Sequence, residues 1–179
     1  LALFETRIRR VIVATHIYFC ALRNSITFAT PMKLSFSVVD HIKHLPDTWQ
    51  KFAPLKKALS IENIGVQDRA GLPDLKSYYL TAVENEQTLF IAYFQLLCVN
   101  PSHFNLGEKK QQQFWLNLAL RLVKPTLLVA GNLFRHDENF FHFTDHLSTD
   151  DRQEIYRQSI AFMIGHTNAS GIFLKDIPQ

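Results

Sequence analysis

The feature that most constrains the fold of this sequence is the stretch Leu127–Asn132 together with the pattern that follows it. Leu127-Leu-Val-Ala-Gly-Asn132 is typical of a buried strand stopped by a glycine. A polar loop is expected from Leu133 to Phe143, an amphipathic helix from Asp150 to Ile164, and a second buried strand from Ile172 to Ile177. This order predicts a β-loop-α-β unit, with the loop and the helix N-terminus together at the carboxyl edge of the strands. Open α/β sheets commonly bind ligands at that edge, so we expect the functional site there.

Length and composition indicate one globular domain with a substantial core. The chain has 179 residues, of which 47% are hydrophobic and 20% charged; these values are typical of a globular protein and argue against a disordered or low-complexity one. The net charge of +3 is small, and the basic residues are scattered apart from Arg7, Arg9 and Arg10. No DNA partner is therefore expected.

The two cysteines point to a reducing compartment. Cys20 and Cys98 lie in apolar surroundings and show neither a CxxC motif nor a Cys/His spacing typical of a metal site. We interpret them as buried thiols, and we expect the protein to be cytoplasmic.

Residues 1–31 are left out of the fold argument. A basic patch, Arg7-Ile-Arg-Arg10, precedes an apolar run from Val11 to Leu22, and the first methionine is Met32. The segment can be upstream translated sequence outside the native protein, a native N-terminal helix, or a targeting segment; we favour the first, because His16 interrupts the apolar run and no small-residue cleavage site follows. The run is too short to span a bilayer, so stable membrane insertion is not expected. Residues 32–179 then form the single domain.

Further elements are expected on both sides of this unit. We predict a strand at Lys33–Val39, a short helix at His44–Phe52, a polar turn at Gly65–Gly71 and a helix at Lys109–Val123, and we leave Leu55–Ile64 unassigned. Thr88–Val99 is apolar almost throughout and predicts a strand, or two strands joined by a bend, buried on both faces. Two apolar stripes at helical spacing are expected: one in a helix beginning at Pro73 and Asp74, comprising Leu75, Tyr78, Tyr79, Ala82 and Val83, and one in the Lys109–Val123 helix, comprising Trp115, Leu118, Ala119 and Leu122.

No catalytic signature stands out. The sequence contains no GxSxG, GxGxxG or GxxxxGKS motif. Lys175-Asp176 at a strand end can be an ion pair or a substrate contact, and the structural interpretation is the more common one. Metal donors gather within one segment but lack HExxH or facial-triad spacing, so we expect a solvated loop and no metal; these donors are His136, Asp137, Glu138, His142, Asp145 and His146.

Four short motifs carry a family resemblance across most of the chain. They are Tyr78-Tyr-Leu-Thr-Ala-Val-Glu84, Ala92-Tyr-Phe-Gln95, Leu128-Val-Ala-Gly-Asn132 with a loop ending in Phe140-Phe141, and Phe173-Leu-Lys-Asp176. In their order and spacing, from about Trp49 to Ile177, the chain resembles the acyl-CoA N-acyltransferase (GNAT) fold, in the FemAB-like peptidoglycan-bridge relatives. The resemblance implies an α/β fold with a mixed central sheet flanked by helices.

The resemblance also implies a function. Thr126–Gly131 would be the splayed central strand, Leu133–Asn139 the pyrophosphate-binding loop, and Asp150–Ile164 the helix that faces the cofactor. The domain would transfer an acyl or aminoacyl group from a small-molecule donor such as acyl-CoA to an amine acceptor. Gly131 and Asn132 would bind the cofactor, where the strand stops, and Lys175 and Asp176 the substrate; the catalytic residues stay unknown.

Two departures from the family pattern keep an alternative open. The usual [QR]xxGx[GA] motif is absent, and no glycine lies between Gly131 and Gly165. A noncatalytic scaffold or substrate-binding domain of the same fold is therefore the alternative function. The fold also normally continues into another helix and a strand pair, so we expect a C-terminally truncated fragment, with a second acyltransferase-like domain beyond residue 179 as a partner.

Overall fold

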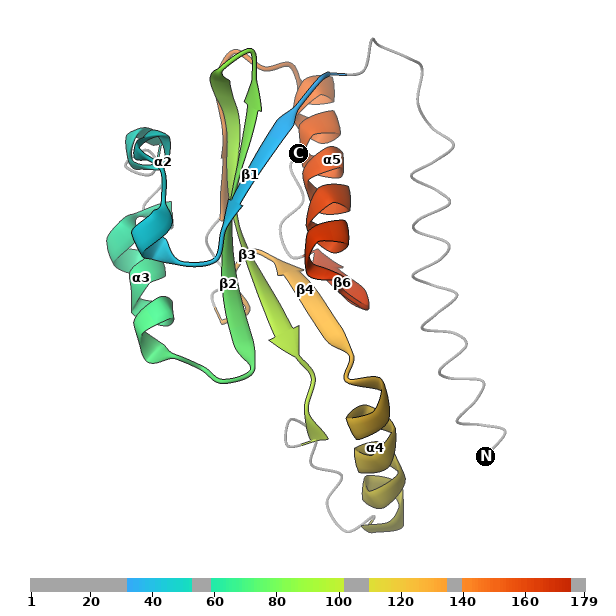
Figure 1. Ribbon diagram of the computed structural model, residues 1–179. Coiled ribbons are helices and arrows are strands. Elements are labelled where there is room, and N and C mark those ends of the chain that lie inside the picture. Colours follow the sequence, from blue (N-terminus) through green and yellow to red (C-terminus); the bar gives the residue numbers. More distant parts are fainter. Residues whose placement is uncertain (1–31, 53–58, 102–109, 135–139, 175–179) are drawn as a thin grey trace. The chain divides into compact units, whose positions relative to one another are not determined.

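The fold is organised around β3, Gln87–Cys98, which is the longest strand of the part that the computed structural model describes, namely residues 32–52, 59–101, 110–134 and 140–174. Every residue of β3 from Thr88 to Leu96 is buried. The sheet has the strand order β1-β2-β3-β4-β6, and β5 pairs with β3 as well (Figure 1). The other strands are β1 (Ser35–Val39), β2 (Leu75–Glu84), β4 (Thr126–Ala130), β5 (Phe141–Phe143) and β6 (Gly171–Leu174).

Helices cover both faces of this sheet within the unit Lys33–Gln179. One face carries α2 (Asp47–Phe52) and α3 (Ile61–Ala70), preceded by the short 3-10 helix η1 (Ile42–His44). The other carries α5 (Thr149–Thr167), where Phe162 stacks on Phe36 of β1 at a ring separation of 4.8 Å. α4 (Lys110–Val123) joins β3 to β4. The expected α/β class with a mixed sheet flanked by helices is confirmed, because β4 and β6 are parallel and the other pairs are antiparallel.

β4 and β5 form one interrupted strand along β3. Ala130 at the end of β4 pairs with Phe94, and Phe141 at the start of β5 pairs with Ala92. Only Tyr93 lies between these partners: its N–H donates to Phe140 O at 2.8 Å, and its carbonyl accepts from Gly131 N at 3.0 Å. The chain therefore leaves the sheet after Ala130 and rejoins it at Phe141, and Gly131 and Phe140 at the two ends of this departure both bind Tyr93.

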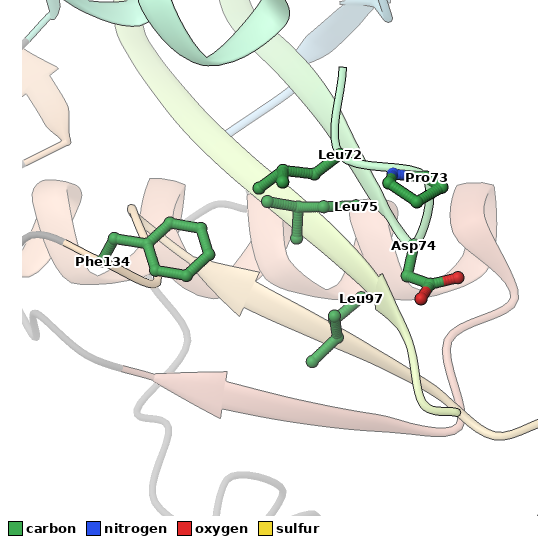
Figure 2. Close-up of a pocket in the computed structure, with 6 residues that line it drawn as sticks. All are labelled: Leu72, Pro73, Asp74, Leu75, Leu97 and Phe134. Atoms are coloured by element: carbon green, nitrogen blue, oxygen red, sulfur yellow. The ribbon is translucent and has the colours of Figure 1, made fainter. Parts of the chain in front are cut away.

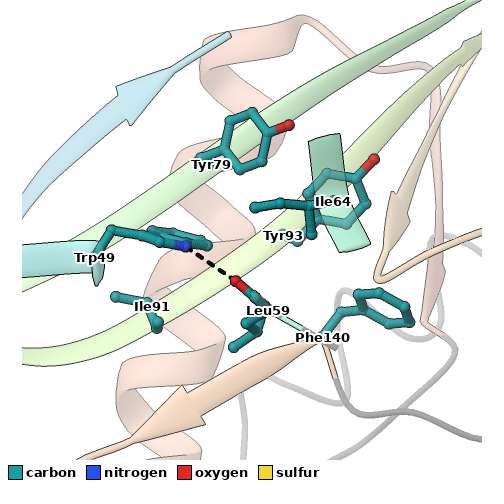
Figure 3. Packing of buried hydrophobic residues seen from close by; sticks show 7 residues of the cluster. All are labelled: Trp49, Leu59, Ile64, Tyr79, Ile91, Tyr93 and Phe140. Carbon is teal, nitrogen blue, oxygen red and sulfur yellow. Dashed lines mark hydrogen bonds between the residues drawn. The ribbon is translucent and has the colours of Figure 1, made fainter. Parts of the chain in front are cut away.

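The core on the α2 and α3 face is aromatic (Figure 3). Trp49 of α2 lies edge-on to Tyr79 of β2, with ring centroids 5.7 Å apart, and its indole N–H donates to Leu59 O at 3.4 Å. These contacts join the helices to the sheet. The cluster comprises Trp49, Leu59, Ile64, Tyr79, Ile91, Tyr93 and Phe140.

The helix predicted from Pro73 onward is wrong, because Leu75–Glu84 is strand β2. Residues Tyr79 to Ala82 are all buried, since β2 lies between β1 and β3 and is covered on both faces. A strand buried on both faces is apolar throughout, so it also places apolar residues at helical spacing. Aromatic and β-branched residues such as Tyr78 and Thr81 favour the extended conformation.

The polar turn predicted at Gly65–Gly71 is also wrong, because most of it belongs to α3. Ser60 caps this helix by accepting a hydrogen bond from Asn63 N, and Gly71 ends it in the left-handed conformation with φ 57°. Gly65 lies within the helix and is buried, so here the glycine does not mark a turn.

The polar loop predicted from Leu133 to Phe143 is wrong at its end, because Phe141–Phe143 is strand β5. The other predicted helices and strands are confirmed with shifted ends. β1, α2, β3, α4, β4, α5 and β6 lie at the expected positions, and Ser148 caps α5 as its sequence indicates. Residues 175–177 of the predicted last strand lie outside the described residues. The stripe expected on α4 faces outward, however: Trp115, Leu118 and Leu122 are exposed.

Replacing Trp49 with alanine should lower the free energy of unfolding by about 3–5 kcal/mol, because the change leaves a cavity between α2 and the sheet. Val66→Ala, on the exposed side of α3, should change it by less than about 0.5 kcal/mol. Urea denaturation of both variants tests this. Equal stabilities would contradict the assigned packing of α2.

Candidate functional site

Gly131 and Asn132, the cofactor-binding residues that the family resemblance implies, lie directly after β4. Gly131 has φ 110°, a backbone conformation that favours glycine over residues with a Cβ. Its N–H donates to Tyr93 O, so this amide already has an acceptor within the sheet. The glycine thus turns the chain out of the sheet.

The next residues hold the loop against β3. The side chain of Asn132 is only 3% exposed, and its Oδ1 accepts from Phe134 N at 2.9 Å, which closes a local turn. Leu133 N donates to Gln95 Oε1 at 2.6 Å. The N–H groups of Gly131, Leu133 and Phe134 therefore all have protein acceptors.

Three paired rows of side chains lie beneath this loop on one face of β2 and β3. The register pairs Leu75 with Leu97, Ser77 with Gln95, and Tyr79 with Tyr93. Because alternate residues of a strand share a face, these pairs form consecutive rows that run from an apolar pair to a polar pair and then into the aromatic core. The loop after β4 contacts the polar row through Gln95.

The polar row is hydrogen-bonded and fully buried at Gln95. Gln95 Nε2 donates to Tyr93 Oη at 3.0 Å, and Tyr93 Oη lies 2.9 Å from Ser77 Oγ. Burial raises the pKa of Tyr93 to about 12, although the hydrogen bonds with Ser77 and Gln95 oppose this shift. Burial, together with the nearby carboxylate of Asp68, also raises the pKa of Tyr79 well above its ordinary value. Both phenols stay protonated at neutral pH, so neither acts as a base in this state.

A shallow hollow borders the apolar row (Figure 2). Its volume is about 190 Å³, and it is lined by Leu72, Pro73, Asp74, Leu75, Leu97 and Phe134. Phe134, which comes from the loop after β4, is 58% exposed and faces Leu97 and Leu75 across the hollow. Pockets for whole small molecules usually enclose about 300–1,000 Å³, so this hollow fits a short apolar group.

The sequence predicts the N-terminus of α5 beside this loop, but strand β5 comes between them (Figure 1). β5 follows the loop first, and its last residue pairs with Phe90, four residues along β3 from the partner of Ala130. At about 3.3 Å per residue, Phe143 lies roughly 13 Å along β3 from the end of β4, and α5 begins only after five further residues, at Thr149. Ser148 Oγ accepts from Asp151 N, and Asp150 and Asp151 lie in the first turn, so carboxylates occupy the positive end of the helix dipole.

Several residues singled out from the sequence lie outside the described residues. They are Lys175 and Asp176, proposed for substrate binding, and His136, Asp137 and Glu138 of the donor-rich segment. Among residues that are described, no group of three or more His, Cys, Asp or Glu side chains is placed to hold a metal ion. Cys98 is a free thiol of intermediate exposure.

Comparisons with known proteins add no family assignment. No protein-family model matches the chain, and neither curated proteins nor solved structures give a match. Within the described ranges, no helix has the length and apolar character needed to cross a membrane.

Sequence reasoning did not single out Ser77, Tyr93 and Gln95 as a linked group. The available signal was Gln95, the only amide side chain in the apolar run Thr88–Val99. A buried amide needs partners, because leaving it without hydrogen bonds costs free energy. Which partners it has depends on the pairing of β2 with β3.

Raising the pH above about 10 should destabilise the protein through Tyr93. An unfolded tyrosine ionises near pH 10, whereas the raised pKa of folded Tyr93 is about 12. Its contribution to the free energy of unfolding is therefore complete below pH 10 and is lost as the pH rises to 12. Tyr93→Phe removes this contribution. The variant's free energy of unfolding should fall less steeply above pH 10, by up to about 1.4 kcal/mol per pH unit.

At pH 7 the same variant should be less stable by about 1–3 kcal/mol, because Gln95 Nε2 and Ser77 Oγ lose a partner. Chemical denaturation at pH 7, 9, 10 and 11 measures both effects. The same pH dependence in wild type and variant would contradict the assigned burial of the Tyr93 hydroxyl.

Proposed function

We propose that this chain is an acyltransferase-like domain of GNAT type, with FemAB-like relatives, which transfers an acyl or aminoacyl group to an amine. The observation that carries the proposal is the strand arrangement. β1 to β4 are antiparallel neighbours in chain order, and β6 then lies parallel to β4 after the crossover through α5. This arrangement fits the mixed central sheet that the resemblance implies.

The interrupted central strand supports the same proposal. The fold inferred from the sequence motifs has a splayed central strand, and here the chain leaves the sheet between β4 and β5 opposite Tyr93. In the proposed site the donor lies at the edge formed by Gly131 and Asn132. Its acyl group enters the hollow beside Phe134, which has a size suited to a short apolar group.

The chemistry needs a polarised thioester or ester carbonyl and a base that takes the proton of the amine. The Gly131 N–H can polarise the carbonyl only by exchanging its present acceptor, Tyr93 O, for the substrate. Lys175 and Asp176 are proposed substrate contacts. No metal is required in this scheme.

The second candidate is a noncatalytic scaffold or substrate-binding domain of the same fold. The hydrogen bonds of the site favour this candidate. The backbone N–H groups of Gly131, Leu133 and Phe134 all donate to oxygen atoms of the protein itself. The N-terminus of α5 supplies no phosphate site at this edge either, because β5 precedes it and Asp150 and Asp151 occupy its first turn. A scaffold needs neither a backbone N–H that is available to a substrate nor a phosphate-binding site.

Calorimetric titration of the full chain with acetyl-CoA, and separately with an aminoacyl-tRNA, distinguishes the two functions. The transferase proposal expects saturable binding of one donor, whereas a scaffold binds neither. Phe134→Ala should weaken binding at least threefold by removing one wall of the hollow. Phe114→Ala, an equally exposed phenylalanine of α4, should leave it unchanged.

Gly131→Trp tests the edge itself. It should abolish donor binding, because the side chain occupies the turn out of the sheet and φ 110° disfavours any residue with a Cβ. Circular dichroism must show that the variant is folded. Unchanged binding in folded Gly131→Trp and in Phe134→Ala would remove the site from this edge.

A further inference from the structure

The apolar stripe predicted in the Lys109–Val123 helix is present on α4, and its large side chains are exposed. α4 projects past the ends of β3 and β4 and does not lie on a face of the sheet (Figure 1). Five of its large apolar side chains are between 40% and 76% exposed. They are Phe114, Trp115, Leu118, Leu122 and Val123, and we call them the α4 apolar face.

The spacing of these residues makes one continuous surface. Phe114, Leu118 and Leu122 follow each other at intervals of four residues, and Trp115 lies beside them because it comes three residues before Leu118. Gln113 donates to Asn117 Oδ1 at 2.9 Å on a different side of the helix. Given these exposed fractions, the face exposes on the order of 500 Å² of apolar surface, which is in the range of the largest apolar patch on a typical monomer, a patch that is often functional.

The charges beside the α4 apolar face indicate what could cover it, a second copy of the chain or an anionic surface. From Lys110 to Pro125 the sequence contains no Asp or Glu, whereas Arg121 and Lys124 are both exposed. Arg121 borders the apolar face, because it lies three residues after Leu118. The α4 helix of a second copy would offer these cations no carboxylate, so pairing of two α4 helices leaves the charges uncompensated.

We propose that α4 is an interfacial helix that lies in the plane of an anionic lipid surface. An apolar face with Trp, Phe and Leu beside cationic side chains is the pattern of helices that bury one side at the boundary between headgroups and acyl chains. The apolar face enters that boundary, and Arg121 and Lys124 contact anionic headgroups. At 14 residues the helix is about 21 Å long, which suits in-plane binding and does not reach across a bilayer.

The test is vesicle binding by the full chain. Vesicles of equal parts phosphatidylglycerol and phosphatidylcholine should sediment the protein, pure phosphatidylcholine vesicles should bind it at least tenfold more weakly, and 0.5 M salt should reduce binding to the anionic vesicles. The chain has two tryptophans, and Trp49 is already fully buried. A blue shift of tryptophan emission on anionic vesicles therefore reports Trp115 of α4.

Variants assign the effect to α4. The double variant Leu118→Glu/Leu122→Glu should lose at least tenfold in vesicle partitioning and show no blue shift. Val66→Glu, which places one new carboxylate on an apolar side chain of α3 that is 57% exposed, should retain both. Thermal melting confirms that the variants are folded, as expected for changes at exposed positions.

Three outcomes would overturn the proposal. The first is a lack of binding to anionic vesicles. The second is binding that leaves the emission of Trp115 unchanged or that persists in the double variant, because another segment then makes the contact. The third is self-association in solution that the double variant abolishes, without vesicle binding, because the α4 apolar face then packs against a second copy.

Discussion

The whole site depends on the two backbone hydrogen bonds of Tyr93. Its N–H and C=O would ordinarily pair with one residue of a continuous neighbouring strand, yet they bind Phe140 O and Gly131 N, which lie on either side of a departure from the sheet. Because both bonds are made, the buried centre of β3 leaves no backbone group of Tyr93 without a partner. The loop therefore starts and ends at a fixed place beside Tyr93, and its first residues contact Gln95 through Leu133 N.

The side chain of the same residue connects the sheet to the start of the loop. Tyr93 Oη receives a hydrogen bond from Gln95, whose other amide atom accepts from Leu133 N. The strand thus fixes the loop once through its backbone and once through a buried amide. A buried polar network specifies one structure only while every member has a hydrogen-bond partner. This role accounts for the polar side chains inside an otherwise apolar strand.

The sequence predicted those parts of the fold that are encoded locally. The apolar run of β3, the glycine after β4 and the Ser148 cap of α5 are signals within a few residues, and each marked its element. β2 was assigned as a helix because burial on both faces removes the alternation that identifies a strand. The link from Ser77 through Tyr93 and Gln95 to Leu133 depends on strand pairing across many residues, which periodicity does not encode. Likewise, the periodicity of α4 revealed an apolar stripe but not which way it faces.

The closure of the loop at a single residue also bears on how such a domain can diverge. The two ends of the segment 131–140 are held by one residue of β3, so the distance between them is independent of how many residues lie in between. For a loop with fixed ends, each doubling of length costs only about 0.6 kcal/mol of closure entropy. Insertions between Phe134 and Phe140 can therefore accumulate while the sheet keeps its register. Proteins that share this sheet can therefore come to differ, through evolution, in the residues and the chemistry at this edge.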